Sequence, residues 1–168
     1  MDLQKLVRQN IISLKPYSSA RDEFSGEAGV FLDANENPFG DLNRYPDPHQ
    51  QTLKDKLKDI KKLTSKQVFI GNGSDEVIDL LIRIFCNPSI DKIVVCPPTY
   101  GMYEVAANIN DVMVLSVPLT EGFQLDTEAL QQVISQSEPN TLKLIFLCTP
   151  NNPTGNSIDN IEWVLANF

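Results

Sequence analysis

The fold is indicated by an apolar run in the last third of the chain, Leu142-Lys143-Leu144-Ile145-Phe146-Leu147-Cys148. Only Lys143 interrupts the run, and apolar and polar residues do not alternate along it. Such a run is typical of a strand that is covered on both faces, as the strands of parallel sheets are. Outward from it, shorter apolar stretches predict strands at residues 67–70, 93–96 and 112–117, and a weaker one at 30–32.

Helical patterns alternate with these strands. They predict helices at residues 75–85, 100–109 and 126–135, and a short amphipathic one within 2–12. Asp47 followed by Pro48 predicts the start of a further helix, whose apolar stripe is Leu53, Leu57, Ile60 and Leu63. The alternation indicates an α/β fold, a mostly parallel sheet flanked by helices, with an N-terminal arm.

The last predicted helix has Ser157 as its cap and an apolar side that still continues at the end of the chain. That side is formed by Ile158, Ile161, Val164, Leu165 and Phe168. No glycine, proline or basic residue closes the helix. We therefore expect the chain to be the N-terminal part of a longer protein.

Composition and charge argue against several classes of partner. The 168 residues are 42% hydrophobic and 21% charged, with a net charge of −8, which fits a globular protein that binds neither nucleic acid nor membrane. The basic cluster at 54–62 is interleaved with Asp55 and Asp59, so we expect a solvated, ion-paired helix face. No apolar run reaches the roughly 18 residues of a membrane span, and the N-terminus lacks the plan of a secretory signal, so we expect a cytoplasmic protein.

The cysteines and the histidine argue against metal and hydrolase chemistry. Cys86, Cys96 and Cys148 are widely spaced in apolar surroundings, as buried free thiols are. His49 is the single histidine, which disfavours a zinc site or a Ser-His hydrolase. We expect no metal.

Three loops carry the candidate chemistry. Gly71-Asn72-Gly73-Ser74-Asp75-Glu76 precedes a helix, whose free N–H groups favour a phosphate, although the loop could equally be a tight turn. Pro97-Pro98-Thr99-Tyr100-Gly101-Met102-Tyr103 follows a strand, and its prolines would present Tyr100 for stacking on a flat ring or for packing. Thr149-Pro150-Asn151-Asn152-Pro153-Thr154-Gly155 follows the most apolar strand and holds amide donors between prolines. Loops at the carboxyl ends of parallel strands build the ligand crevice of such sheets.

With these motifs the chain resembles the fold-type I pyridoxal-phosphate enzymes, and within them the histidinol-phosphate aminotransferases. The resemblance also covers Asn35-Glu36-Asn37-Pro38 and Asn43-Arg44-Tyr45-Pro46, in the family's order and spacing. It implies residues 1–46 as an arm that begins the small domain and contacts the dimer partner. Residues 47–168 would then be a truncated cofactor-binding large domain.

The resemblance implies a role for each matching residue. Gly73, Ser74 and Asp75 would hold the phosphate of pyridoxal 5'-phosphate, Tyr100 would stack on its ring, and Asn152 would bond its phenolic oxygen. Tyr45 would reach the cofactor phosphate of the partner subunit in a homodimer. Tyr17 and Asn35 would approach the substrate, histidinol phosphate or its keto counterpart imidazole acetol phosphate, with glutamate and 2-oxoglutarate as the amino donor and acceptor pair. The resemblance also suggests a cis peptide bond between Asn152 and Pro153.

The family's Schiff-base lysine has no counterpart among the ten lysines of the chain. We therefore expect no catalytic residue here and no transamination by this chain alone. A threonine-phosphate decarboxylase or an aromatic aminotransferase is an alternative within the class. A non-catalytic domain that binds a phosphorylated metabolite is an alternative outside it, and a dinucleotide-binding domain is disfavoured by Glu76 in place of a third glycine.

Overall fold

The computed structural model describes residues 3–19, 23–24, 29–30, 32–41 and 44–168. The chain forms two compact units. The first comprises Met1–Ser13 and Asn72–Phe168, and the second comprises Leu14–Gly71. The division into residues 1–46 and 47–168 stays a prediction.

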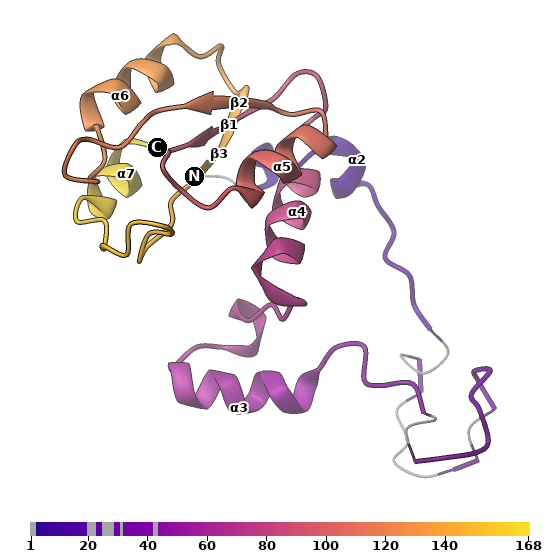
Figure 1. The fold of residues 1–168 in the computed structure, drawn as a ribbon. Coiled ribbons are helices and arrows are strands. Elements are labelled where there is room, and N and C mark those ends of the chain that lie inside the picture. Colours follow the sequence, from indigo (N-terminus) through magenta and orange to yellow (C-terminus); the bar gives the residue numbers. More distant parts are fainter. Residues whose placement is uncertain (1–2, 20–22, 25–28, 31, 42–43) are drawn as a thin grey trace. The chain divides into compact units, whose positions relative to one another are not determined.

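The first unit contains a three-stranded parallel sheet (Figure 1). The strands are β1 (Lys92–Val95), β2 (Met113–Ser116) and β3 (Leu142–Phe146), in the order β2-β1-β3. Ile93 of β1 lies opposite Val114 of β2 and Leu144 of β3. The sheet confirms the predicted α/β class, and each of these strands lies within the stretch predicted for it, give or take a residue.

Helices cover both faces of this sheet. Four helices of the first unit follow the predicted pattern: α4 (Gly73–Phe85), α5 (Met102–Ile109), α6 (Thr127–Gln136) and α7 (Ile161–Asn167). Ile93 and Val95 belong to one core cluster, with Ile82 of α4 and Ala107 of α5. The intervening residue Val94 belongs to the other cluster, which contains the remaining two helices' core residues Leu130 and Val164. Because side chains alternate along a strand, β1 is buried on both faces. The strand for which this was predicted, β3, is the last in the sheet order and its residues are only partly buried.

Two helix starts differ from the prediction. Asp126, which was predicted in the first turn of its helix, instead caps α6, because its carboxylate accepts a hydrogen bond from the N–H of Ala129 at 2.9 Å. Ser157 does not cap α7. The helix begins only at Ile161, and the neighbouring Ile158 N–H instead donates to Thr149 Oγ1 at 3.1 Å. Of the apolar side predicted for this helix, Ile158 and Val164 are buried and Leu165 is exposed.

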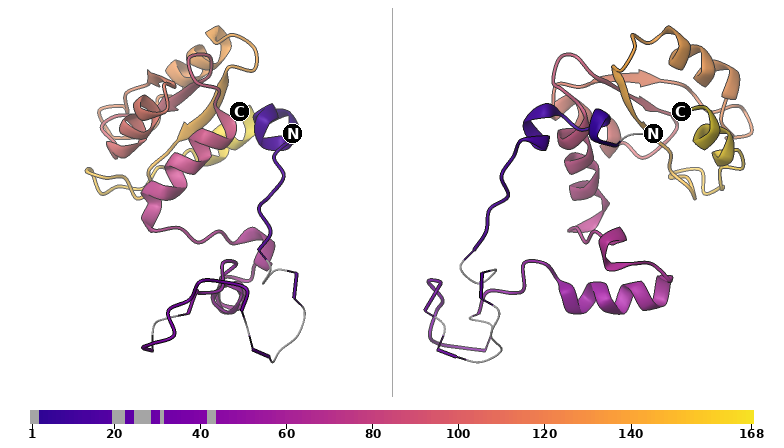
Figure 2. Two further views of the ribbon diagram at one scale, coloured as in Figure 1. Left: turned by 90° about the vertical axis from the view of Figure 1, so that its right-hand side faces the viewer. Right: turned by 180° about the vertical axis from the view of Figure 1, so that it is seen from behind.

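The helix predicted within residues 2–12 is interrupted. It forms two short helices, α1 (Leu3–Leu6) and α2 (Gln9–Ile12), which Figure 2 shows as separate turns; Asp2 lies outside the described residues. Arg8 has an extended backbone (φ −57°, ψ 139°). Its N–H donates to Ile84 O at 3.0 Å and its guanidinium to Arg83 O at 2.7 Å. These bonds to carbonyl groups at the end of α4 hold Arg8 out of a continuous helix.

The second unit contains the helix α3 (Gln51–Lys61) and the 3-10 turn η1 (Ser65–Gln67). Asp47 stabilises the start of α3 as expected: its carboxylate accepts from the N–H groups of His49 at 2.8 Å and Gln51 at 2.7 Å. The helix itself begins at Gln51, later than the Asp47-Pro48 pair suggested. The strand predicted at 67–70 is wrong, because no neighbouring strand pairs with it and a strand needs such a partner for its backbone groups.

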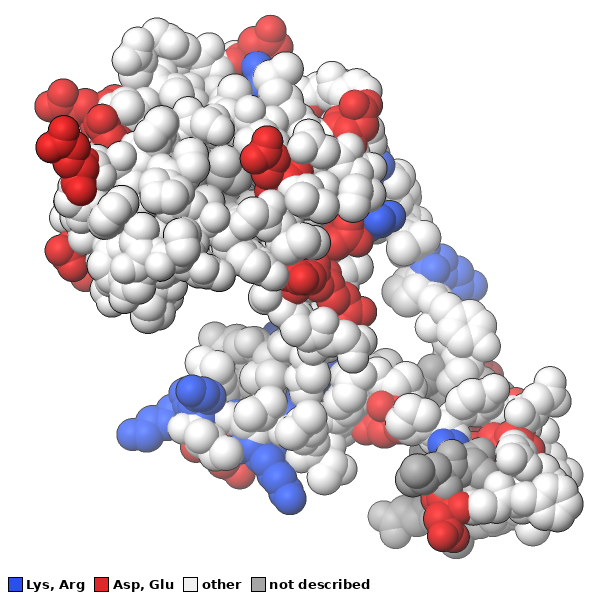
Figure 3. All heavy atoms as spheres, in the orientation of Figure 1, with Lys and Arg blue, Asp and Glu red and all other residues white. Residues whose placement is uncertain are grey.

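Three sequence predictions concern the surface of this unit. The basic residues gather on α3 (Figure 3), and Lys58 forms an i,i+3 ion pair with Asp55 at 3.0 Å, as expected for a solvated face. The predicted apolar stripe lies largely in solvent, with Leu53, Ile60 and Leu63 exposed. The weak strand at 30–32 includes Phe31, which lies outside the described residues; Val30 and Leu32 are exposed and form no strand.

The cysteines are free thiols, and two of them are buried as predicted. Burial raises the pKa of the Cys86 thiol to about 12 and that of Cys96 to about 11. Cys148 is partly exposed. In the described part of the chain no cluster of metal-ligating residues occurs, and no helix there is long and apolar enough to cross a membrane.

Alkylation rates should distinguish the two buried thiols from the partly exposed one. We expect iodoacetamide at pH 8 to modify Cys148 first, and Cys86 and Cys96 at least about 100-fold more slowly than in the denatured chain, because only the thiolate reacts. The rates of the two buried thiols should rise as the pH rises toward their folded-state pKa values. Mass spectrometry of timed digests measures all three positions, with the urea-unfolded chain as the reference. Equal rates at the three cysteines in the folded chain would contradict the burial described above.

Candidate functional site

The three candidate loops meet at one cavity of the first unit. It has a volume of about 400 Å³, within the usual range for small-molecule sites. Ser74 comes from the start of α4, Tyr100 from the loop after β1, and Asn152 from the loop after β3. Because β1 and β3 are adjacent and parallel, their carboxyl ends bring the latter two loops to the same edge of the sheet. The remaining lining residues are Tyr103, Leu147, Cys148, Thr149 and Pro150.

The first turn of α4 offers backbone donors to this region. Gly73 has a φ of +77°, which allows the sharp entry into the helix. Asn72 makes no side-chain cap, and the Glu76 carboxylate instead accepts from Asn72 itself, from its N–H and from Nδ2 at 3.1 Å. Among the described residues no side chain or loop carbonyl accepts from the N–H groups of Gly73, Ser74 or Asp75. Such free donors at the positive end of a helix suit an anion.

Tyr100 is held by two neighbours. Its hydroxyl donates to Asp75 Oδ1 at 2.9 Å, and its ring meets that of Tyr103 edge to face, with centroids 5.7 Å apart. Tyr103 is in turn stacked on Phe146 of β3 at 4.9 Å. The hydrogen bond to Asp75 raises the pKa of Tyr100 above its ordinary value. Tyr100 thus packs on its neighbours and lines the cavity at the same time.

The two asparagines of the 149–155 loop lie in different surroundings. Asn151 is buried, with 4% of its surface exposed, and its Nδ2 donates to Pro98 O at 2.9 Å and to Thr154 Oγ1 at 2.7 Å. Asn152 is exposed and lines the cavity, and no described residue hydrogen-bonds its amide. The Asn152–Pro153 peptide bond is cis, which confirms the prediction, and Pro97–Pro98 and Thr149–Pro150 are cis as well.

Asn151 is a residue that the sequence reasoning missed. It ties the 149–155 loop to the 97–103 loop and so holds two walls of the cavity together. Both asparagines stand between the same prolines, and nothing in the letters says which amide is buried.

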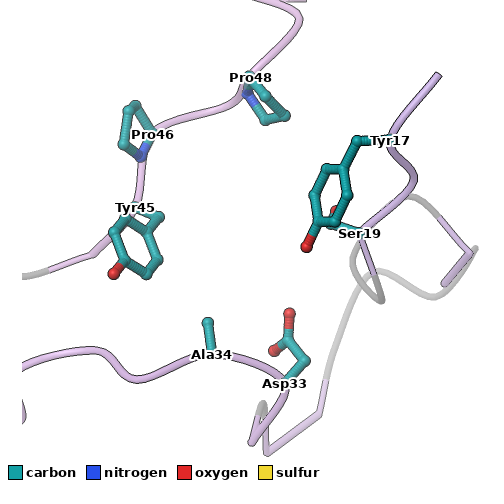
Figure 4. Close-up of a pocket in the computed structure, with 7 residues that line it drawn as sticks. All are labelled: Tyr17, Ser19, Asp33, Ala34, Tyr45, Pro46 and Pro48. Atoms are coloured by element: carbon teal, nitrogen blue, oxygen red, sulfur yellow. The ribbon is translucent and has the colours of Figure 1, made fainter. Parts of the chain in front are cut away.

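The second unit contains a separate cavity of about 410 Å³, shown in Figure 4. Tyr17 and Tyr45 lie on opposite sides of it, and Asp33 and Ala34 form its floor. The Tyr17 hydroxyl and the Asp33 carboxylate point into the cavity, whereas the Tyr45 hydroxyl points away. Ser19, Pro46 and Pro48 complete the lining, so Asn35 is absent from it. The roles predicted for Tyr17, Tyr45 and Asn35 stay predictions.

Glu36 connects the two short motifs of this unit. One carboxylate oxygen accepts from Arg44 Nη1 at 2.5 Å and the other from the N–H of Tyr45 at 3.0 Å. The carboxylate of Glu36 therefore connects the first motif to Arg44 and Tyr45 of the second. The sequence reasoning matched both motifs without seeing that Glu36 links them.

Comparison with known proteins identifies the class. The profile of the family "Aminotransferase class I and II" matches residues 25–166. The chain belongs to this family.

Two curated relatives carry the name of one particular aminotransferase. A histidinol-phosphate aminotransferase of Parabacteroides distasonis is 55% identical over 99% of this chain and 48% of its own length. That of Cytophaga hutchinsonii is 51% identical over 99% of this chain and 49% of its own length. The chain thus spans about half the length of the curated relatives it matches.

Solved structures agree on the fold. The histidinol-phosphate aminotransferase of Clostridium acetobutylicum superposes with a TM-score of 0.59 and 28% identity, over 74% of this chain and 34% of that one. The enzyme of Sinorhizobium meliloti in complex with pyridoxal 5'-phosphate gives a TM-score of 0.62 over 73% of this chain and 32% of that one. At 20% identity the second comparison concerns the fold alone.

Proposed function

We propose that the intact protein is a histidinol-phosphate aminotransferase that uses pyridoxal 5'-phosphate. It would exchange an amino group between histidinol phosphate and 2-oxoglutarate, giving imidazole acetol phosphate and glutamate, in cytoplasmic histidine biosynthesis. The observation that carries the proposal is the meeting of Ser74, Tyr100 and Asn152 at one cavity in a chain 55% identical to a relative of that name.

The residues of the cavity fit this cofactor. The unpartnered N–H groups of Ser74 and Asp75 would bind the phosphate, aided by the helix dipole and by Gly73, whose backbone opens the turn. The Tyr100 ring would lie against the pyridine ring. The exposed amide of Asn152 would donate to the phenolic oxygen.

These residues would bind the cofactor and fix its orientation. When bound, the cofactor supplies a positively charged ring that withdraws electrons from the substrate. Asn152 holds the phenolic oxygen in its ionised form by donating an N–H to it. Tyr100 would contribute its ring, held in place by the hydrogen bond from its hydroxyl to Asp75. Tyr17 and Asn35 would contact the substrate, and Tyr45 would complete the phosphate site of a partner subunit in a homodimer.

The lysine that carries the cofactor would come from outside this chain. No lysine lines the cavity. Lys92 is the first residue of β1 and Lys143 the second of β3, so both lie toward the amino ends of the strands. The cavity lies at the carboxyl ends, about 10 Å away at 3.3 Å per residue. We therefore propose that this chain alone does not transaminate.

A reduction experiment tests this part of the proposal. The 168-residue chain is mixed with a slight excess of pyridoxal 5'-phosphate and reduced with borohydride, and the modified lysines are mapped by mass spectrometry. We expect scattered, substoichiometric adducts on exposed lysines and no transaminase activity. One stoichiometric adduct at a single lysine, together with turnover of histidinol phosphate, would contradict the proposal.

The intact protein tests the reaction itself. We expect it to form glutamate from 2-oxoglutarate in the presence of histidinol phosphate. Carbon dioxide released from threonine phosphate would favour the decarboxylase alternative, and faster turnover of tyrosine or phenylalanine the aromatic aminotransferase. Binding of phosphorylated metabolites without any turnover would favour a non-catalytic domain.

A further inference from the structure

The proposed phosphate site carries two acidic side chains. Asp75 and Glu76 both lie in the first turn of α4, beside the N–H groups that would bind the phosphate. A free carboxylate close to a phosphate dianion repels it. In this structure each carboxylate is engaged by a donor: Glu76 by Asn72, and Asp75 by the hydroxyl of Tyr100 at 2.9 Å.

The partner of Asp75 is the aromatic ring that would cover the cofactor. Tyr100 is half-buried, and among the described residues its ring meets one other ring, that of Tyr103, edge to face at 86°. Tyr103 is buried and stacked on Phe146, so this contact leads back to the sheet. An edge contact alone leaves the ring free to tilt about that edge. The hydrogen bond at Oη fixes the far end of the ring's long axis, and the edge contact with Tyr103 limits rotation about that axis, so the two contacts together fix the plane of the ring.

We propose that Asp75 is a positioning residue whose carboxylate fixes the ring of Tyr100 over the cofactor site through the Tyr100 hydroxyl. This inference rests on the proposed function. Residue 75 would then act at both ends of the cofactor: its backbone N–H at the phosphate and its side chain behind the ring. The same bond occupies the carboxylate, which accounts for an acidic residue in an anion site.

Two neutral replacements of Asp75 show whether its hydrogen-bond acceptor or its negative charge is what matters. Asp75→Asn keeps an oxygen that can accept from Tyr100, whereas Asp75→Ala removes it, and both keep the backbone N–H. In the intact protein we expect Asp75→Ala and Tyr100→Phe each to weaken binding of pyridoxal 5'-phosphate about three- to tenfold, the range that corresponds to the net contribution of one hydrogen bond. Asp75→Asn should stay within about twofold of the unaltered protein.

The double variant tests whether the two residues act as a pair. Asp75→Ala with Tyr100→Phe should bind the cofactor no more weakly than either single variant, because both changes break the same bond. Visible-region circular dichroism of the bound cofactor, measured at saturation, should fall in Asp75→Ala and Tyr100→Phe and be retained in Asp75→Asn. Glu128→Gln, which removes an exposed acid from the first turn of α6, should change neither the affinity nor the dichroism.

The outcomes distinguish this inference from the function on which it rests. If the unaltered protein binds no pyridoxal 5'-phosphate, the proposed function fails and the inference fails with it. If the cofactor binds but Asp75→Ala behaves like Asp75→Asn, the side chain positions nothing and the inference alone is overturned. Additive losses in the double variant would overturn it as well.

Discussion

Asn151→Leu should lower the free energy of unfolding by about 1–3 kcal/mol and abolish cofactor binding at the carboxyl-edge cavity. The buried Asn151 amide donates to Pro98 O and to Thr154 Oγ1. Leucine has a similar size but no donor, so Pro98 O and Thr154 Oγ1 each lose the hydrogen bond from this buried amide. Each lost hydrogen bond costs about 0.5–1.5 kcal/mol. Urea unfolding of the chain measures the stability, and fluorescence titration of the intact protein measures the cofactor.

Asn152→Leu is the matched control. It makes the same chemical change one residue further along, at a side chain that is exposed. We expect its stability to change by no more than about 0.5 kcal/mol, as for most surface substitutions, and cofactor binding to weaken through loss of the proposed donor. Equal losses of stability in the two variants would show that Asn151 does not join the loops.

Ile82→Ala should destabilise the chain by about 2–5 kcal/mol, the range for removing a large aliphatic side chain from a packed core. Ile82 is fully buried, in the core cluster that joins α4 to Ile93 and Val95 of β1. The helix that it anchors carries the proposed phosphate donors at its other end. We therefore expect cofactor affinity to fall together with stability, although Ile82 is absent from the cavity lining.

Ile60→Ala provides the comparison for this core substitution. Ile60 also lies in a helix, α3, but 71% of its surface is exposed. Its replacement should change the free energy of unfolding of the chain by less than about 0.5 kcal/mol. A loss as large as that of Ile82→Ala would mean that the apolar stripe of α3 is covered, contrary to this structure.

The periodicity of apolar residues was enough to predict a helix or strand where its local preference and its tertiary contacts agree. The apolar run at 142–148 predicted a strand covered on both faces; β3 lies there, and its residues contact both core clusters but are only partly buried. The helix predicted at 126–135 forms as α6, shifted by one residue. The same reasoning failed at 67–70, where an apolar stretch has no strand to pair with, and at Ser157, whose neighbour Ile158 donates its N–H to Thr149 rather than starting a helix. Pairing and loop contacts of this kind join residues that lie apart in the sequence.

The sequence by itself determined the α/β class, the order of helices and strands in residues 73–168, and the three loops that would carry the chemistry. Its motifs also pointed to the aminotransferase family, because side-chain alternation, caps and short motifs are local properties. Only the tertiary structure decided that Asn151 is buried and Asn152 exposed, and that Asp75 holds the hydroxyl of Tyr100. Those facts depend on the parallel pairing of β1 with β3, which brings loops about 50 residues apart to one edge of the sheet.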